Sequence, residues 1–128
     1  MSQSEHAATG KVLIVEDNDF VRMQIATFLK GEGYDVVEAS DGVEGLDVID
    51  KKVNLAVVDV RMEPMGGFEF IQVLESEGYK IPVVLVTGDQ NSDLLEKAGQ
   101  YSVSSVLLKP VQKDKLLNMV KRLIARGR

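Results

Sequence analysis

The chain has 128 residues, close to the commonest size of one domain, and no cysteine, which excludes disulfides, thiolate metal sites and a cysteine nucleophile. Its 15 basic and 20 acidic side chains give a net charge of −5 at pH 7, whereas nucleic-acid-binding domains usually carry a basic surplus, so no direct binding of nucleic acid is expected. The apolar runs are far shorter than the ~20 residues that a membrane helix needs, so no membrane insertion is expected. A cysteine-free chain of this kind fits a reducing compartment, and we expect a cytoplasmic location.

Residues 1–9 read as a flexible leader, because they contain no apolar core of the kind a secretory signal requires. The only histidine, His6, lies in this leader and is expected to be a solvated tail residue. Residues 10–128 are predicted to form a single domain, with no linker or repeat inside it.

Five short runs of apolar, largely β-branched residues follow in chain order, at 11–16, 34–39, 54–59, 81–87 and 104–109. Their near-continuous hydrophobicity, without polar alternation, is typical of strands that are buried on both faces of a parallel sheet.

Between these runs lie longer segments in which apolar residues recur at helical spacing. The first helix is predicted to start at Asn18 or Asp19, which are cap candidates, and to stop at Gly31 and Gly33. Asp41, Gly66-Gly67 and 89–91 mark the entries of the next three helices. The last helix carries a basic cluster that is expected to be a solvated face, made of Lys113, Lys115, Lys121, Arg122, Arg126 and Arg128. Strands that alternate with helices predict an α/β fold with a doubly wound sheet.

Polar residues follow four of the predicted strands. Glu16-Asp17 follows the first, Asp59 ends the third, Thr87 ends the fourth and Lys109 ends the fifth. In open α/β sheets, functional sites lie beyond the carboxyl ends of the strands, so these groups converge if the strands are neighbours. Taken singly, each residue is more often a turn, a cap or a helix start than a site residue. Taken together, they indicate one site.

Three carboxylates at one place repel each other unless a cation neutralises them. Oxygen ligands of this type are those that Mg²⁺ prefers, and a lysine beside them would balance the remaining charge. The same set suits phosphoryl transfer to a carboxylate nucleophile, with Thr87 hydrogen-bonded to a phosphoryl oxygen.

On these residues, the chain resembles a receiver domain of the two-component response-regulator family over about residues 10–126. The resemblance implies a flavodoxin-like (βα)5 fold, with strand order 2-1-3-4-5 and helices on both faces. It implies that Asp59 is the phosphoacceptor, that Asp17, Asp59 and the backbone carbonyl of Arg61 bind Mg²⁺, and that Glu16 helps directly or through water. It also implies that Thr87 and Lys109 bind the phosphoryl group and operate the switch.

Three features depart from the family pattern. The proline of the usual Met-Pro pair stands one place later, at Pro64, which predicts an altered loop stiffness with the site retained. Gly88 follows Thr87 and leaves the path of the phosphoryl group open. Val106 occupies the place where many receivers have a switching aromatic residue. Tyr101 could supply aromatic surface there, but an ordinary half-exposed role is favoured.

The resemblance implies a non-enzymatic switch that receives its phosphoryl group from a histidine kinase or a histidine phosphotransfer protein. Its downstream protein partner is expected to bind the face formed by the fourth helix, the fifth strand and the last helix. Two alternatives stay open. One is a phosphorylation-independent interaction module, which Val106 keeps possible. The other is a small Mg²⁺-dependent phosphatase, disfavoured because Arg61 stands where such enzymes have a second acid.

Overall fold

The computed structural model describes residues 9–88 and 92–126. Four sequence predictions fall outside these residues: nearly all of the leader, His6 within it, the helix entry at 89–91 and the terminal Arg128.

Five parallel strands form one sheet in the order β2-β1-β3-β4-β5, which confirms the predicted α/β class and the strand order. Each strand lies within its predicted range and is shorter by one or two residues. The strands are β1 (Lys11–Val15), β2 (Asp35–Ala39), β3 (Leu55–Asp59), β4 (Val83–Thr87) and β5 (Ser105–Leu108).

The central strands explain the unbroken apolar runs of the sequence. Every residue of β3 and β4 is buried, whereas the edge strands β2 and β5 contain exposed and half-buried residues. Successive side chains of β3 point to opposite faces, so that Val57 packs on one side of the sheet and Val58 on the other. Both faces are covered, so neither position can be polar.

Five helices connect and cover the strands. They are α2 (Asp19–Gly31), α3 (Gly42–Val48), α4 (Gly67–Ser76), α5 (Ser92–Gln100) and α6 (Lys113–Arg126). None of the helices in the described part of the chain is long and apolar enough to cross a membrane.

The helix starts follow the capping residues in the sequence. Of the two cap candidates for α2, Asn18 takes the role, because its side chain accepts a hydrogen bond from the backbone of Val21 at 3.0 Å. Asp41 caps α3 in the same way, by accepting from Glu44 at 3.0 Å. The helix α2 ends at Gly31, as predicted, and Gly33 turns the chain toward β2 with a φ of +106°.

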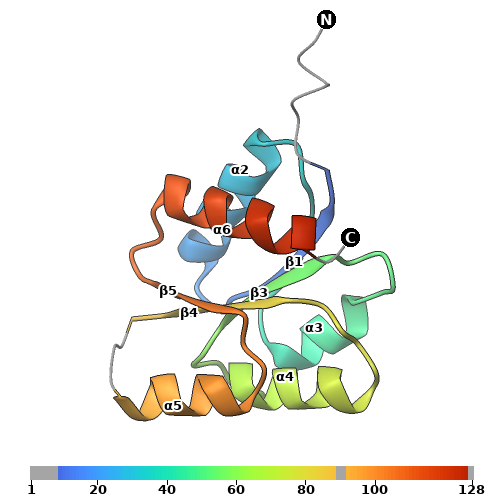
Figure 1. Ribbon diagram of the computed structural model, residues 1–128, viewed down its shortest axis with the longest axis vertical. Coiled ribbons are helices and arrows are strands. Elements are labelled where there is room, and N and C mark those ends of the chain that lie inside the picture. The colour runs from blue at the N-terminus through green and yellow to red at the C-terminus, as the bar shows by residue number, and fades with distance from the viewer. Residues whose placement is uncertain (1–8, 89–91, 127–128) are drawn as a thin grey trace, which may run out of the picture.

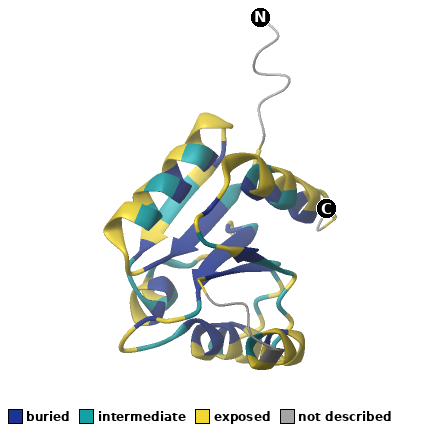
Figure 2. Ribbon diagram, turned by 90° about the vertical axis from the view of Figure 1, so that its left-hand side faces the viewer, coloured by how far each residue is buried: buried dark blue, intermediate teal, exposed yellow. Residues whose placement is uncertain are grey.

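The helices form two layers, with α2 and α6 on one face of the sheet and α3, α4 and α5 on the other (Figure 1). Each layer closes its own apolar core, seen as buried strand segments between the helices in Figure 2. Ile25 and Leu116 are fully buried in the first core, and Phe70 and Leu85 in the second. The sheet is therefore held from both sides, which fixes the relative positions of its strand ends.

The start of α4 lies against the end of β3. The Gly67 backbone donates a 2.9 Å hydrogen bond to Val60, and a Cβ atom on Gly67 would lie 2.3 Å from the carbonyl oxygen of Asp59. No real Cβ contact is that short, so only glycine fits without a backbone shift.

We predict that Gly67→Ala lowers the free energy of unfolding by roughly 1–3 kcal/mol, because the methyl group overpacks against the backbone of β3. Gly99→Ala is the matched control, since nothing lies within 4 Å of its Cβ position in α5. Helix propensity should make that variant more stable by up to about 1 kcal/mol. Urea unfolding measures both, and equal stability of Gly67→Ala and the parent chain would contradict the argument.

Candidate functional site

The residues that end three neighbouring strands meet at one edge of the sheet. In the parallel register, Asp59 at the end of β3 lies beside Val86 of β4, and Thr87 lies beside Leu108 of β5. Lys109 follows directly, and its backbone donates a 2.8 Å hydrogen bond to the carbonyl of Thr87. The sheet register thus brings an acid, a hydroxyl and an ammonium to the same edge.

A cavity of about 340 Å³ opens at this edge. It includes the predicted site residues except Glu16 and Val106. Its lining consists of Asp17, Asn18, Asp59, Val60, Arg61, Thr87, Gly88 and Lys109.

Three carboxylates cluster at the cavity, two of them in its lining and Glu16 directly beside them. Glu16, Asp17 and Asp59 each offer an oxygen within 4.8 Å of the others. Glu16 and Asp59 are only 1% and 5% exposed, whereas Asp17 is exposed. The acid that ends β3 is therefore buried, apart from its opening to the cavity.

One cation balances the two buried acids. The Lys109 Nζ lies 3.2 Å from Glu16 Oε1 and 3.3 Å from Asp59 Oδ1, so that one ammonium bridges both carboxylates. Charges at these distances interact strongly because little water screens them. The bridge ties the residue after β1 and the end of β3 to the residue after β5.

Burial changes the acid–base properties of all three groups. It raises the pKa of Glu16 to about 7, opposed by the hydrogen bond from the Asn18 backbone. Burial also raises the pKa of Asp59, against the attraction of Lys109. For Lys109, burial alone would lower the pKa, but the charges of Asp59 and Glu16 raise it above its ordinary value.

Only one of the two side-chain oxygens of Glu16 accepts a hydrogen bond. Its Oε2 accepts a 3.0 Å hydrogen bond from the Asn18 backbone, and its carbonyl oxygen accepts one of 2.8 Å from the guanidinium of Arg22. Oε1 is buried and has no hydrogen-bond partner among the described residues, only the ion pair with Lys109. The carboxylate thus keeps one oxygen available for a further cation.

This donor set fits a hard divalent cation. Three carboxylates bring more negative charge than Lys109 can neutralise, and a buried oxygen without a hydrogen bond gains from a cation. All-oxygen ligation with room for water is the preference of Mg²⁺. Arg61 lines the same cavity, next to Asp59.

The segment after Asp59 closes back on the sheet despite its displaced proline. Val60 donates a 3.2 Å hydrogen bond to Val86, and Met65 accepts one from the backbone of Gly42 at 3.3 Å. Pro64 lies exposed between these anchors, and Met62 is buried. The loop therefore leaves Asp59 in the cavity with its neighbours, and its stiffness remains a prediction.

Val106 lies apart from the acidic cavity. It pairs with Leu85 in the register of β4 and β5, is half-buried and packs against the core beneath α3, α4 and α5. Thr87, by contrast, is buried and lines the cavity. No aromatic ring stands on β5 that could turn inward beside Thr87.

An aromatic contact occurs elsewhere on this side of the sheet. The ring of Tyr101, which is half-exposed as expected, lies 5.4 Å from that of Phe68 at an angle of 44°. The Lys97 Nζ lies 4.9 Å above the Phe68 ring and 5.9 Å from the Tyr101 ring. This contact joins the start of α4 to the end of α5.

Sequence reasoning missed the role of two residues at the site. The sequence indicates only a capping role for Asn18, which also lines the cavity and holds Glu16 through its backbone. Arg22 forms an ion pair within α2 with Asp19 at 2.6 Å, and a second one with Glu38 at 3.4 Å, which ties α2 to β2. The sequence offers one clue to these roles, which is that Asn18 and Arg22 follow the acidic pair Glu16-Asp17 within two helical turns.

A family model described as the response regulator receiver domain matches residues 12–121. Among solved structures, the chemotaxis protein CheY4 of Vibrio cholerae is 30% identical with a TM-score of 0.83, covering 91% of this chain and 99% of that one.

Two curated relatives are longer proteins. The CAI-1 autoinducer sensor kinase/phosphatase CqsS of Vibrio cholerae is 32% identical over 86% of this chain, which spans 17% of that protein. The transcriptional regulatory protein PdtaR of Mycobacterium tuberculosis is 30% identical over 99% of this chain, which spans 62% of that protein. The chain thus spans less than two thirds of either relative. The residues that the family model matches include those of the acidic cavity and all of the sheet except Lys11. The chain belongs to the response regulator receiver domain family.

Proposed function

We propose that this receiver domain is a phosphorylation switch that accepts a phosphoryl group on Asp59 from the phosphohistidine of a partner. That partner would be a histidine kinase or a histidine phosphotransfer protein of the cytoplasm. The observation that carries the proposal is the placement of Asp59. Its carboxylate is buried, lines a cavity and lies 3.3 Å from an ammonium.

In the proposed reaction, a carboxylate oxygen of Asp59 attacks phosphorus in line with the phosphorus–nitrogen bond of the donor. The new bond makes an acyl phosphate, and the electron pair of the broken bond stays on the imidazole nitrogen. The ring leaves neutral when its other nitrogen carries a proton, and otherwise it takes a proton from water. Lys109 binds a phosphoryl oxygen and offsets the charge that the group brings. Gly88 presents no side chain that could obstruct the approach.

Glu16, Asp17, Asp59 and the backbone carbonyl of Arg61 would hold Mg²⁺, which when bound supplies positive charge to the phosphoryl oxygens. Glu16 contributes through Oε1, the oxygen that pairs with Lys109, either as a direct ligand or through water. The fit of the donor set, with its excess negative charge, supports this assignment.

The proposed switch follows from the doubly charged phosphoryl group that Asp59 would carry. Thr87 and Lys109 would both turn toward it, and they stand at the ends of β4 and β5. Charge-assisted hydrogen bonds contribute about 1.5–3 kcal/mol each. Moving an equilibrium from 1:99 to 99:1 needs about 5.5 kcal/mol. Two such contacts give about 3–6 kcal/mol, which reaches this value only at its upper limit, so a partner that binds the switched form completes the change.

The surface expected to change consists of α5, β5 and α6, because these elements follow Thr87 and flank Lys109. Val106 removes the aromatic half of the usual switch, so the change has to pass through the backbone of β5. A phosphorylation-independent interaction module is the second candidate, and Val106 is the observation that favours it. In that case neither Mg²⁺ nor a phosphoryl analogue would alter the surface.

We predict that Asp59→Asn abolishes phosphate incorporation from acetyl phosphate in Mg²⁺, because the amide cannot form the acyl phosphate. Phosphate-affinity gels and intact-mass measurement give the readout. Asp19→Asn is the matched control, since this nearby acid is exposed and lies outside the cluster, and it should retain incorporation. If Asp59→Asn incorporates phosphate as the parent does, the assignment of the phosphoacceptor is wrong.

Without divalent cations, the free energy of unfolding of the chain should depend on pH. Glu16 binds its proton more tightly in the folded chain, so the free energy of unfolding should fall as pH rises from about 4.5 to about 7. Asp59 acts in the same direction, because its pKa is also raised. Above pH 7, Mg²⁺ should restore stability by binding the ionised cluster.

Urea unfolding between pH 5 and 7.5, in chelator or in Mg²⁺, tests this. Glu16→Gln should flatten the pH dependence and weaken the effect of Mg²⁺, whereas Glu96→Gln on the exposed face of α5 should leave both unchanged. Rising stability over this range in chelator would contradict the prediction.

A further inference from the structure

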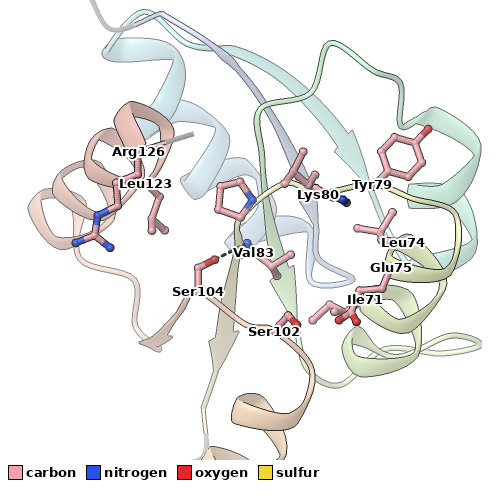
Figure 3. A pocket seen from close by; sticks show the side chains of 12 residues that line it. Ile71, Leu74, Glu75, Tyr79, Lys80, Val83, Ser102, Ser104, Leu123 and Arg126 are labelled. Carbon is pink, nitrogen blue, oxygen red and sulfur yellow. Dashed lines mark hydrogen bonds between the residues drawn. The ribbon is translucent and has the colours of Figure 1, made fainter. Parts of the chain in front are cut away.

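Two cavities larger than the acidic one open elsewhere on the described surface. A groove of about 520 Å³ between β5 and α6 belongs to the face that the proposed switch would change. The other cavity, of about 670 Å³, lies at the opposite edge of the sheet, where β4 begins, and shares no residue with the acidic cavity (Figure 3). We call it the β4-entry pocket; it lies beside Val83, with Leu123 and Arg126 of α6 on one side and Leu74 and Glu75 of α4 on the other.

The β4-entry pocket has an apolar floor that reaches both cores of the domain. Leu123 belongs to the core beneath α2 and α6, whereas Ile71, Leu74 and Val83 belong to the core beneath α3, α4 and α5. All four side chains are at most 7% exposed. The surface therefore dips between the two helical layers at the first residue of β4. The volume of the pocket lies in the range of sites that hold small organic molecules, which are lined mainly by apolar side chains.

The two walls of the pocket differ in charge. Arg126 is the only charged lining residue on the α6 wall, whereas Glu75 and Lys80 stand on the opposite wall, formed by α4 and the segment that follows it (Figure 3). Arg126 forms no ion pair with any residue of the ranges 9–88 and 92–126. Glu75 and Lys80 bring opposite charges to one wall, so the guanidinium of Arg126 carries the uncompensated charge of the lining.

Hydroxyl groups lie between the two walls. Ser102 and Ser104 both line the pocket (Figure 3). The Ser104 Oγ accepts a 3.3 Å hydrogen bond from the Val83 backbone, which orients the hydroxyl and leaves its proton for donation to a ligand. The pocket thus offers an acidic ligand both a hydroxyl donor and a guanidinium.

The lining selects a ligand by charge and by polarity. Two cations and one carboxylate disfavour a cationic ligand, and a neutral apolar molecule would leave the guanidinium of Arg126 without a partner. A guanidinium matches a carboxylate in shape, because two parallel N–H groups bind its two oxygens. The remaining surface of the ligand has to be apolar, since the floor offers no polar side chain.

We propose that the β4-entry pocket binds an apolar monocarboxylate of small-molecule size, such as a medium-chain aliphatic acid. Its carboxylate pairs with Arg126, and its hydrocarbon chain covers Leu74 and Val83. This binding goes beyond the proposed phosphorylation and does not depend on it, because the residues of the two cavities are different.

The probes are octanoate, octan-1-ol, octylamine and butanoate. Chemical shifts of backbone amides in the full chain measure binding, and octanoate should shift the amides of Val83, Ser104 and Arg126 in a saturable manner. Octan-1-ol and octylamine should bind about fivefold more weakly or worse, because they lose the charge-assisted hydrogen bonds. Butanoate should bind about tenfold more weakly or worse, because it buries less hydrocarbon. Chelator in place of Mg²⁺ should leave the affinity for octanoate unchanged.

Variants locate the carboxylate. Arg126→Gln should weaken octanoate about fivefold and reduce its advantage over octan-1-ol to less than about twofold, a change of selectivity that a general loss of structure would not produce. Arg122→Gln is the matched control, because Arg122 is an exposed arginine one turn earlier on α6, outside the pocket lining; it should change affinity less than about twofold. Glu75→Gln should tighten octanoate by up to about twofold, since it removes a like charge. Circular dichroism and urea unfolding verify that each variant is folded.

The pocket proposal is overturned if octylamine binds as tightly as octanoate, if butanoate does so, or if no probe gives saturable shifts at the pocket. Equal weakening by Arg122→Gln and Arg126→Gln also overturns it, as does weaker binding of octanoate to Glu75→Gln. Phosphate incorporation on Asp59 in a chain that does not bind octanoate defeats the pocket alone. Arg126-dependent binding of octanoate to a chain that takes up no phosphate supports the pocket and defeats the proposed phosphorylation.

Discussion

A single ammonium between two buried carboxylates sets the conditions for the rest of the site. Glu16 and Asp59 are almost inaccessible to solvent, and each would be costly to ionise in that environment. Lys109 lies within ion-pair distance of both and makes a partly ionised cluster tolerable. The compensation is incomplete, because two carboxylates and exposed Asp17 face one lysine. That deficit of positive charge is what suits the cavity, in the proposed function, to Mg²⁺ and to the phosphoryl group that it would accompany.

The fold serves this arrangement by fixing strand ends that lie far apart in the chain. The parallel register aligns β1, β3, β4 and β5, and the two cores hold the sheet from both faces. Local anchors then position the individual groups. Arg22 holds the backbone of Glu16, and Gly67 allows α4 to begin in contact with the end of β3. The precision of the site therefore comes from backbone packing more than from contacts between its side chains.

Much of the fold and of the site could be predicted from the sequence, because the patterns that mark strands and strand-end residues are local. Unbroken β-branched runs predicted each strand to within two residues at either end, and polar residues at strand ends predicted which side chains meet. The burial of Glu16 could not be predicted in the same way, since it depends on the Asn18 backbone and on the guanidinium of Arg22. The contact of Phe68 with Tyr101 joins two helices that no sequence pattern relates. The basic face of α6 was expected to be simply solvated, yet Lys115 and Arg122 border a groove that exists only once β5 lies beside the helix.

The position of Lys109 has a consequence for how the molecule is made. Synthesis proceeds from the amino end, so Glu16 and Asp59 leave the ribosome before the lysine that balances them, which follows the last strand of the sheet. Until β5 docks, burying both acids is unfavourable, and the partial sheet keeps its carboxylates hydrated at its open edge. The ion pair of Asp59 is therefore complete only once Lys109 is in place beyond β5. In the proposed function, a chain that lacks β5 and Lys109 is therefore a poor acceptor of phosphoryl groups.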